Sequence, residues 1–466
     1  MTRIRISPVT RLNGFWSVEV EVKDGQVVDA RSSGIFFRGL ELILMGRDPR
    51  DAGYLTERIC GICSSAHATA SALGLEDAFG LTVPANGVLL RNLIFGGDLL
   101  QNHLRHFYLM TLPDFVQGPD RPPFIPRYEA DYRFTERESE NLYQHYLEQL
   151  EMSRKSHEMT VLFGGKIPHT HGILAGGGTV PPDADKVRQF GAMLDQVSRF
   201  IEEKMVPDAY LLADRYPEYF EVGEGYRNLI SYGMFQEPGT PGERVFKGGT
   251  VIDGQAGELD PDKITEQVTR SWYADDKPLH PARGRTIPAP GKEEGYSWVK
   301  APRYNGLPFE TGPLARLWLR GDYRRGYAAM DRLLARVLEA RLVASLMKKW
   351  LAALDPGQPV FQSYELPDSG EGVGLTGAMR GALGHWFRMK GRRLTAYQVV
   401  TPSAWNLSPR DDGGQPGPVE KALLGTPIAD PKNPIEIGRV IRSYDPCLAC
   451  AAHIVFLQGE KRVFKI

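Results

Sequence analysis

The sequence predicts an α+β protein that is mainly α, with a central bundle of long helices and small β-sheets at its periphery. Two patterns carry this prediction, and a 466-residue chain with 42% apolar residues can bury the large core that it requires. Apolar residues recur at helical spacing in four long stretches, 88–112, 136–163, 182–206 and 323–352. Apolar and polar residues alternate as in strands at 3–30, 359–366 and 394–400.

Composition excludes some classes of partner. The formal net charge is −1, so nothing favours nucleic acid or an anionic membrane surface. No apolar run is long enough to cross a bilayer, so we expect no direct membrane span. The alternating pattern starts almost at Met1, so we expect no signal peptide.

The predicted elements follow one another within a single unit, 1–466. Residues 3–30 form a hairpin with its turn at Asp24-Gly25, because strand alternation flanks an Asp-Gly pair. The remaining parts, in chain order, are a helical core at about 50–210 and 323–352, a peripheral excursion rich in Gly, Pro and Tyr at 215–310, and a C-terminal part at 360–453.

A glycine-rich stretch, 370–386, lies between the two predicted C-terminal strands. It surrounds a single arginine, Arg380. So many glycines imply backbone that is held close to something else.

The four cysteines of the chain form two Cys-x-x-Cys pairs, and the pairs lie nearly the whole chain apart. Cys60 and Cys63 are near the start, and Cys447 and Cys450 are near the end. Two pairs of soft ligands with this spacing indicate one tetrathiolate metal site, closed when the two ends pack together. A structural zinc site or two redox pairs are the simpler alternatives. His67, one helical turn after Cys63, fits a hydrogen-bonded core histidine or a support of this site equally well.

The chain resembles the large subunit of nickel–iron hydrogenases essentially from end to end, with that family's fold. The motifs that carry the resemblance are Arg38-Gly39-Leu40-Glu41, Glu57-Arg58-Ile59-Cys60-Gly61-Ile62-Cys63, Leu90-Arg91-Asn92-Leu93, Gly164-Gly165-Lys166-Ile167-Pro168-His169, Gly312-Pro313-Leu314-Ala315-Arg316, Arg380-Gly381-Ala382-Leu383-Gly384-His385-Trp386, Trp405-Asn406-Leu407-Ser408-Pro409-Arg410-Asp411 and Asp445-Pro446-Cys447-Leu448-Ala449-Cys450-Ala451-Ala452-His453.

The resemblance implies a catalyst that splits H2 heterolytically into protons and electrons, in the uptake direction. It implies a nickel–iron centre whose iron carries carbon monoxide and two cyanides. Cys60 and Cys447 would bind nickel terminally, and Cys63 and Cys450 would bridge the two metals. A hard second cation, usually magnesium, would be bound by Glu41, the carbonyl of Val399 and His453.

The resemblance also assigns residues around the centre. Arg380 would stand above its open edge, held by the carboxylates of Asp114 and Asp445. The other residues expected beside the diatomic ligands or the cavity roof are Ser403, Leu383, Met379 and Pro402.

Two positions depart from the family pattern. The chain reads Arg11-Leu12-Asn13-Gly14 where these enzymes have Arg-x-Glu-Gly, with a glutamate that transfers protons. Asn13 can form hydrogen bonds but cannot titrate, so the sequence predicts slow proton exchange or another proton route. Met379 replaces the usual proline before the arginine, and we expect it to change the cavity roof.

The resemblance implies several partners. No cysteine is left for iron–sulfur clusters, so electrons would leave through an iron–sulfur small subunit to a downstream acceptor, in a heterodimer or a dimer of heterodimers. Nickel chaperones would load the metal, and a maturation protease would then remove 454–466. We expect a cytoplasmic complex, one held at a membrane through its partner, or one exported with the small subunit.

Other functions remain open at this point. They are an H2-sensing subunit with low turnover, the quinone subunit of respiratory complexes that shares the fold, and a metal-free scaffold. The quinone subunit usually lacks these cysteines, so the sequence argues against it.

Overall fold

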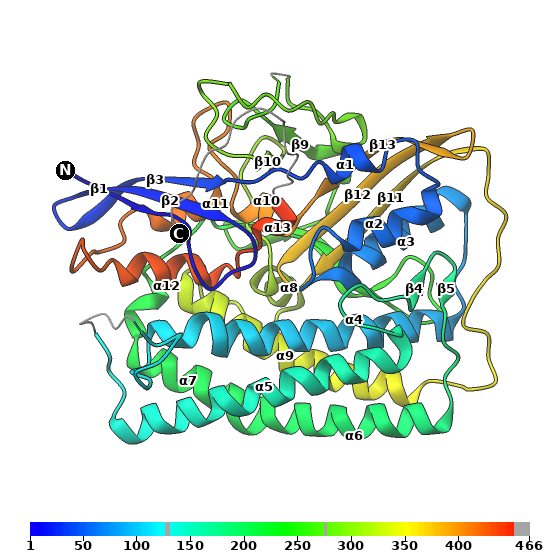
Figure 1. The fold of residues 1–466 in the computed structure, drawn as a ribbon, viewed down its shortest axis with the longest axis horizontal. Helices are drawn as coiled ribbons and strands as arrows, with labels where there is room; N and C mark the ends of the chain where they lie inside the picture. Colours follow the sequence, from blue (N-terminus) through cyan, green and yellow to red (C-terminus); the bar gives the residue numbers. More distant parts are fainter. Residues whose placement is uncertain (126–130, 275–276, 452–466) are drawn as a thin grey trace.

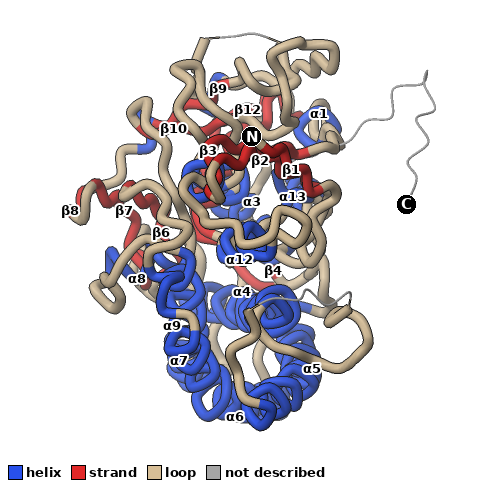
Figure 2. Tube along the Cα trace, turned by 90° about the vertical axis from the view of Figure 1, so that its left-hand side faces the viewer, coloured by secondary structure: helices blue, strands red, loops and turns tan. Residues whose placement is uncertain are grey.

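The computed structural model describes residues 1–125, 131–274 and 277–451, and the side chains of Cys450 and Ala451 lie outside this description. Long helices form the lower layer of the molecule, and small sheets with short helices lie above them (Figures 1 and 2). This arrangement confirms the predicted α+β class with a helical bundle.

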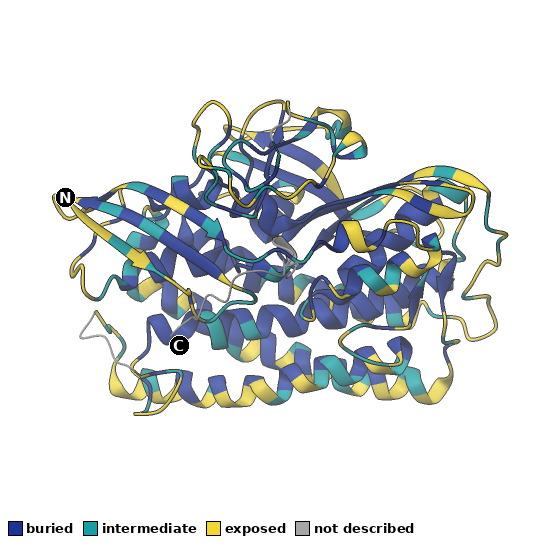
Figure 3. Ribbon diagram, turned by 45° about the horizontal axis from the view of Figure 1, so that its top comes forward, coloured by how far each residue is buried: buried dark blue, intermediate teal, exposed yellow. Residues whose placement is uncertain are grey.

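Four long helices make up the bundle, and each of the four predicted helical stretches corresponds to one of them. They are α4 (Ala85–Arg105), α5 (Glu136–Gly164), α6 (Ala184–Phe200) and α9 (Ala329–Ala352). Helix α4 packs against α5 and α9, and α6 packs against α5 and α9 in turn, which closes the bundle. The inner faces are buried, whereas α5 and α6 expose their outer faces (Figure 3).

The ends of these helices follow from local sequence signals, with some differences from prediction. Helix α5 begins after Thr135, whose hydroxyl accepts a hydrogen bond from the Glu138 amide while the Glu138 carboxylate accepts one from the Thr135 amide. The helix predicted to end near 206 runs further. Helix α6 is followed by a π-helical turn at Ile201–Met205, which leads directly into α7 (Val206–Arg215).

Helices α4 and α5 approach each other closely at Gly97. A Cβ atom there would lie 2.2 Å from the hydroxyl oxygen of Thr160 on α5, so a side chain could not fit without moving one of the helices. The neighbouring Asp98 therefore sits on a tightly packed part of α4 and is itself buried.

The upper layer contains an antiparallel sheet in the order β11-β12-β13. Its strands are β11 (Ser369–Ala378), β12 (Gly381–Lys390) and β13 (Arg393–Val400). The predicted strand at 394–400 is thereby confirmed. The predicted strand at 359–366 is wrong, because that segment forms only an isolated bridge between Phe361 and Gly177.

The glycine-rich stretch itself forms β11 and most of β12, and its glycines serve close packing. Helix α3 (Ser64–Phe79) lies across β11. A Cβ atom at Gly374 would lie 1.8 Å from the carbonyl oxygen of Ala70 on α3, so only glycine allows this approach. The expectation that this backbone is held close to something is confirmed.

The N-terminal part forms a three-stranded antiparallel sheet, β1-β2-β3, with the predicted turn between β2 and β3. The strands are β1 (Thr2–Ile6), β2 (Trp16–Lys23) and β3 (Gln26–Gly34). Helix α11 (Pro418–Leu423) packs on β3, and α12 (Ile435–Ser443) packs on α11 and α9. Both ends of the described chain therefore meet in this region.

The segment 215–310 is not wholly peripheral. Strand β6 (Asn228–Gln236) is almost entirely buried and contacts β11. The other strands outside the two sheets above are β4 (Ile173–Leu174), β5 (Gly177–Gly178), β7 (Arg244–Ile252), β8 (Gln255–Gly257), β9 (Ile264–Gln267) and β10 (Ala301–Tyr304). The remaining α-helices are α1 (Leu40–Ile43), α2 (Ala52–Glu57), α8 (Pro313–Arg320), α10 (Pro402–Asn406) and α13 (Leu448–Ala451).

Candidate metal centre

Three of the four thiols meet in the interior between the two layers. The sulfur atoms of Cys60, Cys63 and Cys447 lie within 4.8 Å of one another, and those of Cys60 and Cys447 are 3.3 Å apart. All three residues are at least 96% buried. The predicted meeting of the two ends is confirmed for these three. Cys450 belongs to α13, but its side chain lies outside the described residues.

Backbone contacts from the N-terminal part hold the C-terminal cysteine segment in place. The amide of Leu448 donates a 2.7 Å hydrogen bond to the carbonyl oxygen of Asn13, and Asn13 and Cys447 form a parallel bridge. Gly14 has a φ of +92°, and a Cβ atom there would lie 2.4 Å from the amide nitrogen of Ala449. Glycine is required here because no side chain fits between the two segments.

Arg38 joins the two cysteine segments from the other side. Its guanidinium donates hydrogen bonds to the carbonyl oxygens of Arg58 and Ile59, just before Cys60, and to that of Ala449 after Cys447. One cation thus binds both backbones. The sequence motif contains Arg38, but the motif alone does not reveal this role.

Asn13 places its amide on two of the sulfur atoms. Its Nδ2 group donates to Cys60 Sγ at 3.1 Å and, at the longer distance of 3.6 Å, to Cys447 Sγ. The backbone amide of Cys447 in turn donates to the Ser403 hydroxyl, 3.2 Å away. Amide donors stabilise negative charge on sulfur, but a carboxamide does not exchange its protons as an acid does.

Arg380 occupies the turn between β11 and β12, close enough to the three described cysteines that their charge acts on its guanidinium. Its Nε donates to the backbone carbonyl of Asp445 at 2.8 Å, and its Nη2 lies 2.9 Å from the Asp445 carboxylate. Burial alone would lower the pKa of Arg380, but the charges of Asp445 and the three described cysteines outweigh burial and raise it well above its usual value. The group is therefore a fixed cation. Within the part of the chain that the structure describes, its Nη1 is buried without a hydrogen-bond partner, which is an unusual cost in a protein interior.

Asn102, not Asp114, completes the support of Arg380. Asn102 on α4 accepts a 2.8 Å hydrogen bond from Arg380 Nη2 and donates one, also 2.8 Å, to the Asp445 carboxylate. The predicted contact between Asp114 and Arg380 is wrong among the contacts that the structure describes. Asp114 lies beyond the end of α4, where its carboxylate accepts hydrogen bonds from Arg11 and Arg442.

These carboxylates stay charged although they are buried. Burial would raise the pKa of Asp445, but Arg380 and Arg336 lower it to about 2. Burial likewise opposes the lowered pKa of Asp114, which Arg11 and Arg442 cause. Both groups are structural anions at neutral pH and are poor proton acceptors.

His67 is a hydrogen-bonded core histidine one turn after Cys63. Its Nδ1 lies 3.1 Å from His385 Nε2, and His385 Nδ1 lies 2.9 Å from the Tyr397 hydroxyl. Burial lowers the pKa of His67 to about 4 and that of His385 well below its usual value. Both rings are therefore neutral at pH 7.

Apolar side chains close the site. Leu383 and Met379 are fully buried in the hairpin that carries Arg380, and Pro402 is buried at the start of α10. Their burial is consistent with the expected positions around the cavity.

Glu41 and Val399, two of the three expected ligands of a hard cation, lie together. The Val399 amide donates to Glu41 at 2.9 Å, and the Thr286 hydroxyl donates to the other carboxylate oxygen. The ammonium group of Lys300 is 3.9 Å from Glu41, so a cation there would share this carboxylate with a lysine. His453 lies outside the described residues.

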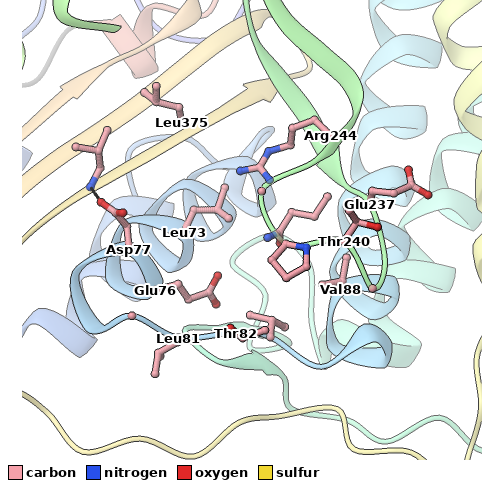
Figure 4. Close-up of a pocket in the computed structure, with 17 residues that line it drawn as sticks. Leu73, Glu76, Asp77, Leu81, Thr82, Val88, Glu237, Thr240, Arg244 and Leu375 are labelled. Carbon is pink, nitrogen blue, oxygen red and sulfur yellow. Dashed lines mark hydrogen bonds between the residues drawn. The ribbon is translucent and has the colours of Figure 1, made fainter.

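The open pocket in Figure 4 is separate from the thiols. It has a volume of about 600 Å³ and lies between the end of α3 and the loop from β6 to β7, with Glu76, Asp77 and Arg244 in its wall. None of its lining residues is a cysteine. Because the thiols are buried, only a very small molecule could reach them without a change in the fold.

The comparisons with known proteins agree with this geometry. The family model described as nickel-dependent hydrogenase matches residues 38–120, 111–327 and 322–453. The chain is 42% identical to the periplasmic [NiFeSe] hydrogenase large subunit of Desulfomicrobium baculatum, with 100% of this chain and 97% of that protein covered. It is 32% identical to the hydrogenase-1 large chain of Escherichia coli, with 99% and 96% covered.

Solved structures give the same result. The [NiFeSe] hydrogenase of Desulfovibrio vulgaris Hildenborough in the reduced state matches with a TM-score of 0.95 and 42% identity, covering 97% of this chain and 100% of that chain. The described fold and its buried thiols define a thiolate metal enzyme. The chain belongs to the nickel-dependent hydrogenase family and is a nickel–iron hydrogenase large subunit.

Across residues 1–125, 131–274 and 277–451, no helix combines the length and the apolar character that a membrane crossing needs.

Proposed function

We propose that this chain catalyses H2 uptake, and that its electrons pass to an iron–sulfur small subunit and then to a downstream acceptor. The observation that carries the proposal is the buried guanidinium of Arg380, partly unpartnered among the described residues and close to three converging thiols. A structural zinc site needs only its four ligands. A preorganised cation aimed at the same sulfur cluster is typical of a site where charge changes during a reaction.

The residues present fit a nickel–iron centre. Soft thiolates suit nickel and low-spin iron, and the three described cysteines are buried. When bound, such a centre supplies the two-electron chemistry of H2 cleavage. We propose Cys60, Cys63, Cys447 and Cys450 as its ligands, with carbon monoxide and two cyanides on the iron.

The surrounding residues would orient and screen the centre. Arg380 holds a positive charge toward it, and Asp445 and Asn102 fix the guanidinium plane. Asn13 and Ser403 donate or accept hydrogen bonds next to Cys60 and Cys447, which would tune the charge on those sulfurs. Leu383, Met379 and Pro402 would exclude water from the diatomic ligands. His67 would support the α3 end of the site as a neutral ring.

Two further proposals follow from the family. A magnesium-like cation would be held by Glu41, the Val399 carbonyl and His453, with Lys300 displaced from the carboxylate. A maturation protease would remove 454–466 after nickel chaperones have loaded the site. The intact mass of the nickel-loaded protein tests this step, since a mature species that keeps Phe464 would contradict cleavage.

Activity of the purified complex tests the main proposal. H2 should reduce an artificial electron acceptor, and infrared spectra should show bands of bound carbon monoxide and cyanide. Nickel should be present, with iron in excess of it because the small subunit adds iron–sulfur clusters. Zinc in place of nickel, or an inactive complex with full nickel occupancy, would contradict it.

A sensory role is the second candidate, and Asn13 is the observation that favours it. A neutral amide beside the sulfurs would slow proton release and therefore turnover. Turnover well below that of matched uptake enzymes, with intact infrared bands, would favour the sensor.

A further inference from the structure

A second set of polar side chains, on α3, α4 and α5, begins two residues after Cys63 in the chain. Ser65 lies in the first turn of α3, which Cys63 caps. Its hydroxyl donates a hydrogen bond to Asp98 Oδ2 on α4, and its backbone amide lies 3.4 Å from the same oxygen. Ser65 and Asp98 are both at least 99% buried.

The other carboxylate oxygen of Asp98 faces a histidine. Asp98 Oδ1 and His157 Nε2 are 3.8 Å apart, and both atoms are buried without a hydrogen-bond partner among the described residues. Two complementary orphan atoms at this separation need only a small side-chain rotation to form a hydrogen bond. The His157 side chain is 27% exposed on α5, so this set of residues reaches solvent.

The groups near the thiols that might otherwise accept a proton are poorly suited to it. Asn13 is an amide, Arg380 is a fixed cation, and Asp445 has a pKa of about 2. His67 continues into His385 and Tyr397, which are fully buried. The Ser65 set, by contrast, combines a hydroxyl, a carboxylate and an imidazole in a line to the surface.

We propose that Ser65, Asp98 and His157 form a route by which protons leave the thiol centre for solvent. Asp98 takes the hydroxyl proton of Ser65 while Ser65 takes a proton from the side of the centre. After rotation, the carboxyl group gives its proton to His157 Nε2, and His157 releases one from Nδ1 to water. Ser65 and Asp98 return to their starting forms. His157 ends in its other tautomer, and proton exchange with water restores the first, so only a proton is moved overall.

Charged neighbours on other elements would influence this route. Glu57 on α2 is buried and senses the charge of Asp98, and Arg58, Lys166 and His169 lie in the same field.

This inference rests on the proposed H2 chemistry. Two measurements distinguish a failure of the proton route from a failure of that chemistry. Conversion of para- to ortho-hydrogen reports cleavage of the H–H bond even when the proton stays in the site. Formation of HD and H2 from D2 in ordinary water requires proton escape. If the wild-type complex does not convert para-hydrogen, the proposed H2 chemistry fails, and the route fails with it.

Asp98→Asn and His157→Gln are the informative variants, with Glu158→Gln on the outer face of α5 as the matched control, since the Glu158 side chain is 44% exposed. We expect D2 exchange to fall about tenfold or more in the first two and to be unchanged in the control, because a missing relay group typically costs at least this much. Para-hydrogen conversion should stay within about twofold of wild type, since H–H cleavage does not use the route. Imidazole in the buffer should restore exchange in His157→Ala.

A purely structural role of Asp98 makes different predictions. Asp98 could simply accept hydrogen bonds at the start of α3, and Asp98→Asn would then loosen that turn. Amide hydrogen exchange of the full chain without metals, followed in peptides covering 64–70, measures such loosening directly. If Asp98 acts in the proton route, the exchange of these peptides should not change. Unchanged D2 exchange in Asp98→Asn, or a joint loss of D2 exchange, para-hydrogen conversion and α3 protection, would overturn the proposal.

Discussion

The Arg380 side and the Asn13 side of the thiol cluster differ in kind. On the Arg380 side, two arginines, a carboxylate and an amide form a buried network, with Arg336 3.1 Å from the same Asp445 that pairs with Arg380. On the Asn13 side, the neutral side-chain amide contacts two of the sulfurs, and the main-chain carbonyl oxygen of Asn13 accepts a hydrogen bond from the Leu448 amide. The first side is rich in charge that does not titrate near neutral pH, whereas the second meets the sulfurs with an uncharged group.

The charged side and the neutral side of the thiol cluster are therefore suited to different tasks. A fixed cation can stabilise charge that develops at the centre, but it cannot carry protons away. An amide can orient a sulfur, but it cannot carry protons either. Neither Arg380 with its partners nor Asn13 provides an acid or base with a pKa near 7, which is why proton transfer in this chain calls for a third region.

Cys447→Ser should have the largest effect, because it removes a proposed metal ligand whose sulfur Asn13 contacts. We expect nickel to be lost and H2-dependent dye reduction to fall by more than about a thousandfold, since a site must keep its ligand number to hold the metal. Elemental analysis and activity of the purified complex check this. Nickel retained at full occupancy would mean that Cys447 is not a ligand.

Arg380→Lys tests the charged side. Lysine keeps the charge but cannot bind Asp445 and Asn102 together, so we expect activity to fall by about a hundredfold with metal content unchanged. The exposed Arg388 on β12 provides the control, and Arg388→Lys should behave as wild type. Equal effects in the two variants would remove any special role for the buried cation.

Glu339→Gln tests how the charged side is built. Arg316 donates to the backbone carbonyls of Ala378 and Met379, beside Arg380, and pairs with the buried Glu339. Burial raises the pKa of Glu339, but Arg316 and His103 outweigh it and lower the pKa to about 2. Because the folded-state pKa is below the unfolded value, this stabilisation is complete above about pH 4.5 and is lost as the pH falls toward 2.

We therefore expect Glu339→Gln to lower the free energy of unfolding by about 3 kcal/mol at pH 7 and to flatten its dependence on acid pH. Thermal unfolding midpoints at pH 7 and pH 4, compared with the exposed Glu202→Gln, provide the measurement. A loss of stability that is the same in both variants would contradict this account.

Asn13→Glu tests the neutral side and should have the smallest effect. A carboxyl group at this position could exchange protons with the adjacent sulfurs, so we expect D2 exchange to rise by up to about tenfold. Asn13→Gln keeps an amide and should not raise it. In the background of Asp98→Asn, the glutamate should restore exchange. No gain in either background would show that proton release is not limited at Asn13.

The sequence is sufficient to predict the helices and the cysteine site because their signals are local or chemically distinctive. Helical periodicity marks α4, α5 and α9, and two identical cysteine spacings indicate one shared site. By contrast, the sequence does not predict β11, because its many glycines are typical of a loop, whereas they allow α3 to pack directly on the strand.

Long-range partners are harder to predict. The family resemblance implies that Asp114 holds Arg380, whereas in the structure Asp114 follows the π-helical turn after α4 and lies beside Arg11 and Arg442. Asn102 contacts Arg380 instead. The sequence signal that could have pointed to Asn102 is its place as a polar residue at helical spacing with the buried leucines of α4. Arg38 and the Asp98–His157 pair depend on contacts between segments distant in sequence, which periodicity and spacing do not reveal.

X-ray absorption at the nickel edge of the purified complex tests the central claim most directly. The account predicts nickel surrounded by sulfur ligands with iron as a close neighbour, and the loss of a sulfur contribution in Cys447→Ser. A site that contains zinc alone, or nickel without iron beside it, would contradict the account.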